Sequence, residues 1–299
     1  MESIVPQLMA NSIIAGGIYA LVALGFNLIY GATKFFNLTH GVIAAIGGYT
    51  VFYITKKNDS LASFFNQSIG GTVFAVLIGV LCAALVGYLL DKFLYKKLRD
   101  RKASPMVFLV ASLGAFTCLQ AFLAILFTSQ FQTLGGGAGD IVTYTIFGGI
   151  ITEVQAIVIV SVVVIMLVLG IFLKKSLFGK SVEAISDDEH VAKIVGIHTE
   201  KIISIVFVIG SAIAGLAGIL VGYDTGLEPT MGMGLLLKGV IASIIGGIGN
   251  VYGGVLGAFL LGFVENFGIW KISGEWKDAI AFGLLIVFLI VRPQGILKR

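Results

Sequence analysis

The stretch FFNLTHGVIAAIGGYTVF, residues 35–52, is almost entirely apolar, yet near its start it carries an amide, a hydroxyl and an imidazole, at Asn37, Thr39 and His40. Similar apolar runs fill the 299-residue chain, of which 58% is hydrophobic and 12% is charged. An ordinary soluble domain carries roughly 25% charged residues. The stretch is therefore expected to be one of several segments that lie in a membrane.

Long runs without Asp, Glu, Lys or Arg define the architecture. Four of them lie between Glu2 and Lys34, Lys102 and Asp140, Lys201 and Asp224, and Lys238 and Glu265. Each exceeds the roughly 20 residues that cross about 30 Å of hydrocarbon as a helix. The short alternating segments of a membrane barrel are not seen. We therefore predict an all-α polytopic membrane protein, a bundle of eight to nine transmembrane helices.

Two of the predicted spans are short and rich in glycine. The full set lies near 8–30, 38–54, 70–90, 106–128, 147–173, 203–222, 236–249, 251–267 and 279–291. The segments that begin at His40 and Lys238 are the short ones, and their polar flanks are typical of broken or re-entrant helices. Gly249, Gly253 and Gly257 form a face on which two helix backbones are expected to approach closely.

The basic residues predict the orientation. Segment 91–102 contains Lys92, Lys96, Lys97, Arg99, Arg101 and Lys102, whereas segment 128–140 contains no Lys or Arg. By the positive-inside rule the first is cytoplasmic and the second external. Arg292, Lys298 and Arg299 then place the C-terminus in the cytoplasm, and the N-terminus lies outside. Because basic residues sit at span ends, the net charge of +4 indicates no nucleic-acid partner.

An internal similarity suggests an inverted repeat. HGVIAAIGG at 40–48 resembles KGVIASIIGG at 238–247, and the predicted orientation sends the two copies in opposite directions. Inverted repeats of interrupted helices build midplane sites in many transporters. Within a single permease domain, 1–299, the inverted halves would be 1–128 and 203–299. The predicted pathway residues are Asn37, Thr39, His40, Gly41, Lys238 and Gly239. Alternatively, Asn37 or Thr39 is an N-cap at the membrane surface and Lys238 extends toward water.

The predicted cytoplasmic loop, 174–202, contains a short amphipathic helix. Ser186 and Glu189 have the spacing of a capping box, Gly196 is a helix stop, and Thr199 is placed to cap the next span. Val191, Ile194 and Val195 form one apolar strip along a helix of about ten residues, which is too short to be stable alone. Its acidic residues disfavour anionic lipid, so docking to a soluble partner is preferred over lying on lipid headgroups.

The chain shows no energy source of its own. Carboxylates are nearly absent from the span interiors, and Glu153, Asp224, Glu228 and Glu265 lie near predicted span ends, which disfavours ion-coupled transport. Gly179-Lys180-Ser181 imitates the end of a phosphate-binding loop, but Lys174 stands where that loop needs its first glycine. We predict no cofactor, no metal site and no enzyme activity, so that any driving force comes from another chain.

These features together are similar to a known family. GGIYALVALGFNLIYG (16–31), NLTHG (37–41), GGIGNVYGGVLGAFLLG (246–262) and the RPQGIL segment near the end resemble the membrane permeases of branched-chain amino-acid ABC importers, of the LivH type. The resemblance implies a prokaryotic inner-membrane subunit that pairs with a second permease of the LivM type. It also implies two cytoplasmic ATPases and an extracytoplasmic binding protein that delivers leucine, isoleucine, valine or a related amino acid, transported by alternating access.

The same resemblance implies that the cytoplasmic loop is the contact with the ATPase. The coupling residues would be Glu183, Ala184, Ser186, Glu189, Val191, Ala192, Ile194, Val195, Gly196 and Ile197. The family often has Phe-Ala where this chain has Leu38-Thr39, so the pathway lining differs from the family's pattern at that point. The family also includes importers of urea and of other amides or amino acids, so the resemblance leaves the substrate open. The alternative function, from another class, is a stand-alone channel or facilitator for a small neutral solute such as urea.

Overall fold

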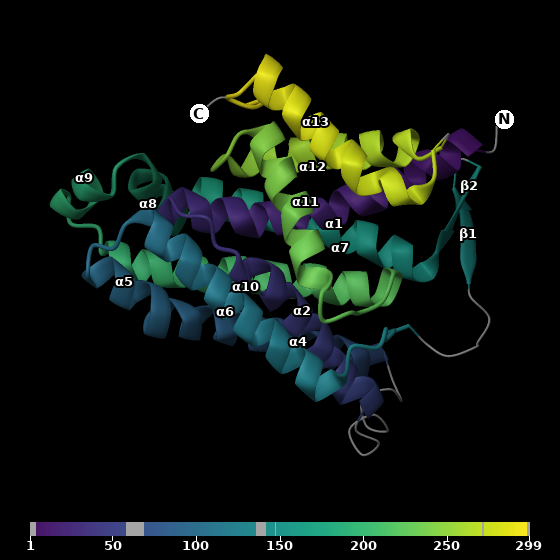
Figure 1. Cartoon of the computed structure of the whole chain (residues 1–299), viewed down its shortest axis with the longest axis horizontal. Helices are drawn as coiled ribbons and strands as arrows, with labels where there is room; N and C mark the ends of the chain where they lie inside the picture. The colour runs from purple at the N-terminus through teal and green to yellow at the C-terminus, as the bar shows by residue number, and fades with distance from the viewer. Residues whose placement is uncertain (1–3, 58–68, 136–141, 147, 271, 298–299) are drawn as a thin grey trace. The chain divides into compact units, whose positions relative to one another are not determined.

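The fold is almost entirely helical (Figure 1) in a computed structural model that describes residues 4–57, 69–135, 142–146, 148–270 and 272–297. The helices are α1 (Ile4–Thr33), α2 (Thr39–Phe52), η1 (Tyr53–Lys57), α4 (Ile69–Leu90), η2 (Asp91–Tyr95), α5 (Lys96–Asp100), α6 (Pro105–Phe127), α7 (Glu153–Lys175), α8 (Leu177–Asp187), α9 (Glu189–Ile194), α10 (Thr199–Asp224), α11 (Met231–Gly246), α12 (Val251–Gly268), η3 (Gly274–Trp276) and α13 (Lys277–Val291). Two strands, β1 (Thr143–Ile146) and β2 (Gly149–Thr152), form an antiparallel hairpin that pairs Thr143 with Thr152.

Six helical stretches in the described residues are long and apolar enough to cross a membrane. They are Ile4–Thr33, Gly70–Asp100, Pro105–Phe127, Glu153–Lys175, Thr199–Asp224 and Val251–Gly268. The helical, polytopic character of the prediction is thereby confirmed, whereas the predicted number of eight to nine spans is not. The helices that contain His40 and Lys238 are short, as expected, with 14 residues in α2 and 16 in α11. Part of segment 128–140, together with Lys298 and Arg299, lies outside the described residues.

One predicted span begins in the wrong place. The span expected over 147–173 starts only at Glu153, because the β1–β2 hairpin occupies the residues before it. A capping box marks the boundary: the Thr152 hydroxyl accepts from the Gln155 backbone N–H, and the Gln155 amide oxygen accepts from the Thr152 N–H, each at 3.2 Å. These reciprocal bonds satisfy two backbone donors at the helix start and define where α7 begins.

The chain forms two compact units, each assembled from separate segments. The first unit comprises Met1–Asn27, Gly136–Ser176 and Leu237–Arg299, and the second comprises Leu28–Gly135 and Leu177–Leu236. Both units take segments from each of the proposed halves, 1–128 and 203–299. The units are therefore a different division from the proposed inverted halves, which stay a prediction.

In the second unit, α2 lies at the centre, beside α10, α4 and α6 (Figure 1). Of its 14 residues, 12 are buried. Glycines allow this burial, because a Cβ built on Gly218 of α10 would lie 1.9 Å from the Ala44 carbonyl oxygen, and one on Gly47 would lie 2.5 Å from the Gly215 carbonyl oxygen. The backbones of α2 and α10 are therefore in direct contact, the arrangement that small residues permit between membrane helices.

In the first unit, glycines bring α11 and α12 together. A Cβ on Gly253 would lie 2.3 Å from the Gly246 carbonyl oxygen, and one on Gly257 would lie 2.0 Å from the Ala242 carbonyl oxygen. The close approach predicted for Gly253 and Gly257 is confirmed. Gly249 is not part of this face, because it precedes α12 in a turn with φ of 81°, where its N–H donates to the Asn27 side chain at 2.9 Å.

The α2–α10 contact leads to a stability prediction. The change Gly218→Ala is expected to lower the free energy of unfolding by about 1–3 kcal/mol, because the added methyl group forces the two backbones apart. Gly283→Ala in α13 is the matched control, since no atom lies within 4 Å of the added Cβ and alanine favours a helix by about 1 kcal/mol over glycine. Chemical denaturation in detergent measures both variants. Equal stability of Gly218→Ala and the unchanged chain would contradict the packing described.

Candidate functional site

The polar residues that open α2 form a closed hydrogen-bonded group in the second unit. The Asn37 side-chain oxygen accepts from the Thr39 backbone N–H at 3.2 Å, from the Thr39 hydroxyl at 2.5 Å and from the Tyr95 hydroxyl at 2.8 Å. Asn37 and Thr39 are 1% and 0% exposed. The alternative that Asn37 or Thr39 is an N-cap at the surface is wrong, because the N-cap position is Leu38 and both side chains are buried. Asn37 instead supports the first turn of α2 from the residue before the N-cap. Tyr95, its partner from η2, has no counterpart in the sequence prediction.

His40 and Gly41 follow inside α2. His40 is fully buried. A Cβ on Gly41 would lie 2.2 Å from the Gly232 carbonyl oxygen of α11, so these two helices also cross in backbone contact. The contacts at the start of α2 are thus capping and packing contacts, and a role of these residues in a solute pathway stays a prediction.

Lys238 belongs to a buried charge cluster in the first unit. The ammonium of Lys238 pairs with the Glu265 carboxylate of α12 and lies 2.8 Å from the Asp278 carboxylate of α13. Tyr19 of α1 donates its hydroxyl to the other Glu265 oxygen at 2.9 Å. Lys238 is 9% exposed and Glu265 is 0% exposed. Lys238 is therefore held between two carboxylates, an arrangement that differs from a lysine extending freely toward water.

Gly239, the neighbour of Lys238, is a packing residue in the same unit. A Cβ at this position would lie 2.5 Å from a methyl carbon of Val22 in α1. Sequence reasoning placed Glu265 near a span end and missed its pairing with Lys238. An ionisable residue inside an apolar helix is a signal for such a partner, because an isolated charge there is costly.

The segment predicted as one amphipathic helix is a pair of short helices, α8 and α9. The predicted capping box is wrong, because Ser186 is buried in the last turn of α8. Asp188 is the N-cap of α9 instead, and its carboxylate accepts from the backbone N–H groups of His190 and Val191 at 2.7 and 3.0 Å. Gly196 ends the segment with φ of 89°, as predicted.

Thr199 also differs from the prediction. Its hydroxyl donates to the Glu189 carboxylate at 3.5 Å and makes no capping bond to α10, whose N-cap position is His198. Glu189 also pairs with Lys193, at 2.6 Å and one helical turn away. Thr199 thus links the start of α10 to α9.

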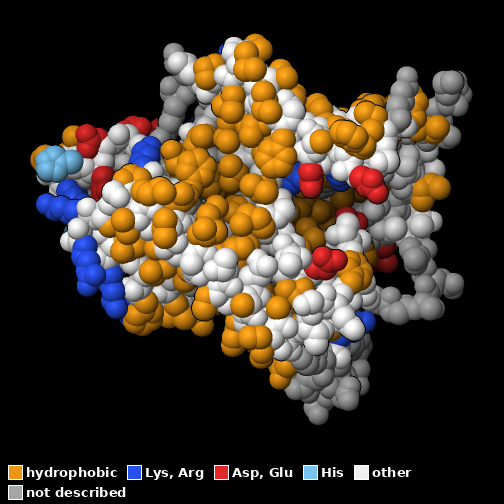
Figure 2. All heavy atoms as spheres, in the orientation of Figure 1, with side chains coloured by type: hydrophobic (Ala, Val, Ile, Leu, Met, Phe, Trp, Pro, Cys, Tyr) orange, Lys and Arg blue, Asp and Glu red, His pale blue; other side chains and the backbone are white. Residues whose placement is uncertain are grey.

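Three apolar side chains project from the end of this helix pair. Val191, Ile194 and Val195 are 52%, 72% and 69% exposed, so the predicted apolar strip exists and has no cover from the described part of the chain. The other predicted coupling residues divide by burial: Ala192 is buried, Ala184, Glu189 and Ile197 are half-buried, and Glu183 and Gly196 are exposed. Figure 2 shows Lys and Arg side chains gathered where α5, α8 and α9 lie.

A buried ion-pair network lies against the helix that follows this strip. The Arg99 guanidinium of α5 lies 2.8 Å from the Asp91 carboxylate and 3.1 Å from the Glu200 carboxylate in the first turn of α10. Ser204 of α10 donates to the other Asp91 oxygen at 2.6 Å. The start of α10 is therefore fastened to η2 and α5. Sequence reasoning used Arg99 only as an orientation signal and missed the network.

The N-cap of α9 makes its stability pH-dependent. The Val191 and His190 N–H groups stabilise the ionised carboxylate and lower the pKa of Asp188. A lowered pKa means that the stabilisation is fully present above the ordinary Asp value of about 4 and is lost as pH falls through the folded-state value. We expect hydrogen-exchange protection of these two amides, corrected for intrinsic rates, to fall on acidification. Asp188→Asn keeps a capping side chain that does not titrate, so protection of the two amides is expected to become independent of pH. If protection in this variant still falls on acidification as in the unchanged chain, Asp188 is not the cause of the pH dependence.

Comparisons with known proteins agree over almost the whole chain. The family described as branched-chain amino acid transport system / permease component matches residues 8–289. The high-affinity branched-chain amino acid transport system permease protein LivH of Salmonella typhimurium is 31% identical over 301 residues, which cover 98% of this chain and 95% of that protein. The corresponding permease protein BraD of Pseudomonas aeruginosa is 30% identical over 298 residues, with the same coverage.

A solved structure shares the fold. A chain in the structure of PsaBC from Streptococcus pneumoniae in complex with Fab matches with a TM-score of 0.50 and 12% identity, covering 95% of this chain and 91% of that one. At this identity the likeness concerns the fold alone.

Proposed function

Since the chain belongs to the family of branched-chain amino acid transport system permease components, we propose that it is the permease subunit of an ABC importer for branched-chain amino acids. It is an integral membrane protein, and six helices in its described residues are long and apolar enough to cross a membrane. Two separate cytoplasmic ATPases drive it, a second permease of the LivM type completes the membrane part, and an extracytoplasmic binding protein delivers the solute. The N-terminus lies outside and the C-terminus in the cytoplasm.

The exposed apolar strip on α9 is the observation that carries this proposal. Val191, Ile194 and Val195 are each more than half exposed, on a six-residue helix that cannot be stable without tertiary contacts. An apolar surface of this kind, rimmed by charges, is typical of a protein–protein contact. We assign it to the ATPase, because the chain itself carries no phosphate-binding loop.

The ion-pair network explains how this contact would move the membrane helices. The start of α10 is fastened to α5 and η2 through Arg99, and α10 is in backbone contact with the central helix α2. A displacement of α9 by the ATPase is therefore expected to move α10 and α2 as rigid bodies. Packed helix interfaces switch between discrete arrangements and do not deform continuously. In the proposed alternating-access cycle this displacement opens the pathway near Asn37–Gly41 and Lys238–Gly239 to the other side.

Reconstitution in lipid vesicles tests the proposal. We expect the purified chain alone to show no leucine uptake, and the complete set of second permease, two ATPases and binding protein to show ATP-dependent uptake. Equilibration of leucine or urea by the chain alone would favour the stand-alone facilitator. Absence of uptake by the complete set for leucine, isoleucine and valine would overturn the proposed solute class.

A further inference from the structure

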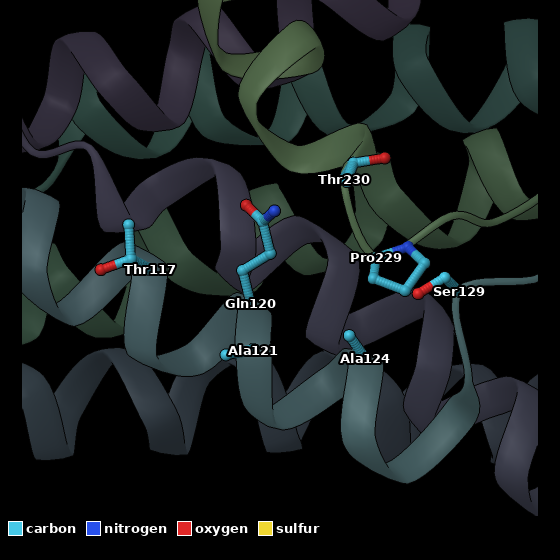
Figure 3. A pocket seen from close by; sticks show the side chains of 7 residues that line it. All are labelled: Thr117, Gln120, Ala121, Ala124, Ser129, Pro229 and Thr230. Atoms are coloured by element: carbon cyan, nitrogen blue, oxygen red, sulfur yellow. The ribbon is translucent and has the colours of Figure 1, made fainter.

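A small cavity with uncharged polar walls lies in the second unit, between α6 and the segment that leads into α11. Its volume is about 190 Å3, and it is lined by Thr117, Gln120, Ala121, Ala124, Ser129, Pro229 and Thr230. Figure 3 shows Thr117 and Gln120 projecting from α6 toward the side on which Thr230 lies. Four of these lining residues are exposed and Pro229 is buried, so the cavity has a floor and an open side.

Gln120 indicates that this cavity is not covered by lipid. It lies within the apolar span of α6, seven residues before the helix ends at Phe127, or about 10 Å along the helix axis. In the described part of the chain no group hydrogen-bonds its side-chain amide. An unpaired amide in contact with hydrocarbon costs several kcal/mol, so its partner is expected to be water or a polar solute that enters the cavity.

The walls suit a solute that is polar at one end, apolar at the other and without net charge. Gln120 and Ser129 supply an amide and a hydroxyl, Ala121, Ala124 and Pro229 supply apolar surface, and no lining residue is ionisable. The Thr117 hydroxyl already donates to backbone carbonyl oxygens of α6 and the Thr230 hydroxyl donates to the Glu228 carboxylate, so these two hydroxyls can only accept from a solute. The volume of about 190 Å3 lies below the roughly 300–1,000 Å3 of pockets that hold drug-sized ligands. The cavity is thus small enough to favour a single small amino acid over a peptide.

The cavity walls are held in place by backbone bonds. Gln132 and Leu227 exchange two hydrogen bonds, at 3.0 and 2.7 Å, and the Leu134 N–H donates to the Gly222 carbonyl oxygen at 3.1 Å. These bonds fasten the segment that follows α6 to the segment that precedes α11. The cavity is therefore formed before any solute enters, as most small-molecule sites are.

From these features we propose that the cavity is an external receiving site for a zwitterionic aliphatic amino acid, with the Gln120 amide hydrogen-bonding the solute backbone. This inference rests on the proposed function and on the predicted orientation, which places the end of α6 outside. There the site accepts the solute released by the binding protein before the pathway opens.

Coupled transport is the first test. In vesicles that hold the complete transporter, Gln120→Met keeps the side-chain length and removes both hydrogen-bonding groups. We expect the amount of leucine imported per ATP hydrolysed to fall about tenfold, because a hydrogen bond lost to a charged backbone group of the solute is worth about that factor. Gln130→Met, an exposed position that does not line the cavity, is expected to leave the ratio unchanged. An unchanged ratio in Gln120→Met would overturn the receiving site.

Solute protection is the second test, and it does not depend on the transport rate. In a background with Cys82→Ala and Cys118→Ala, the residues Thr230 and, as the control, Thr225 are changed singly to cysteine. Leucine is expected to slow labelling of position 230 by an impermeant thiosulfonate reagent at least threefold in intact cells, and to leave position 225 unaffected. Equal labelling with and without leucine would refute the site while leaving the proposed function intact. A complete unchanged transporter that imports no branched-chain amino acid would overturn both.

Discussion

Replacing Glu265 by glutamine is expected to lower the free energy of unfolding by about 3 kcal/mol, because it leaves the Lys238 ammonium buried without its interior carboxylate. The value lies at the low end for a broken buried pair, since Asp278 still contacts Lys238 at 2.8 Å. Glutamine keeps the shape of the side chain and an oxygen for the Tyr19 hydroxyl, so the variant tests charge alone. Chemical denaturation in detergent micelles measures the change.

Two further variants separate this charge effect from a general packing effect. Asp278→Asn is expected to cost less than about 1 kcal/mol, because the Asp278 side chain is 78% exposed and exposed ion pairs contribute little. Adding Lys238→Met to Glu265→Gln removes the orphaned charge, and we expect it to recover most of the lost stability. If Glu265→Gln unfolds at the same denaturant concentration as the unchanged chain, the charge of Glu265 is not needed to stabilise the buried Lys238 ammonium, and the prediction is wrong.

Replacing Val195 by aspartate is expected to lower coupled uptake by at least tenfold in the complete transporter. The side chain is 69% exposed, so the variant should fold and reach the membrane normally. At the proposed ATPase contact, the carboxylate is desolvated without a partner, which costs about 1–3 kcal/mol or more for a charged group. Leucine uptake and ATP hydrolysis are measured in the same vesicles, and hydrolysis is expected to lose its dependence on solute delivery.

Val195→Leu is the matched control, since it keeps an apolar side chain at the same place and is expected to retain coupled uptake. A bulky residue at Gly196 is expected to uncouple as well, because φ of 89° disfavours any residue with a Cβ. Normal coupled transport by both Val195→Asp and Gly196→Val would refute the assignment of α9 as the motor contact.

Most helices of the fold could be predicted because lipid imposes simple requirements on a sequence. A charge-free run of twenty residues has few alternatives to a spanning helix, and Asp, Lys and Arg mark where such runs end. The predicted start of α7 is wrong for a local reason. Residues 147–152 are apolar enough to extend a span, and only the Thr152–Gln155 capping box marks the helix start at Glu153. The predicted count of eight to nine spans is not confirmed, because α2, α11 and α13, with 14, 16 and 15 residues, are shorter than a full crossing requires.

The contacts of the candidate site could be predicted only in part, because they depend on residues that are distant in sequence. The composition of 35–52 shows that Asn37 and Thr39 need hydrogen-bond partners, but it does not indicate that Tyr95 supplies one. Lys238 likewise needs a carboxylate partner in the interior, but the sequence does not indicate that Glu265 supplies it. Burial also decided the cap of α9, since Ser186 packs inward and leaves Asp188 at the helix start.

The burial of α2 has a consequence for the order in which the protein is made. Its glycine faces fit the backbone of α10, which leaves the ribosome roughly 150 residues later, and its polar start is completed by Tyr95. Until those segments arrive, α2 would expose an amide, a hydroxyl and bare helix backbone to hydrocarbon. We therefore expect α2 to reach its final packing only after α10 has entered the membrane.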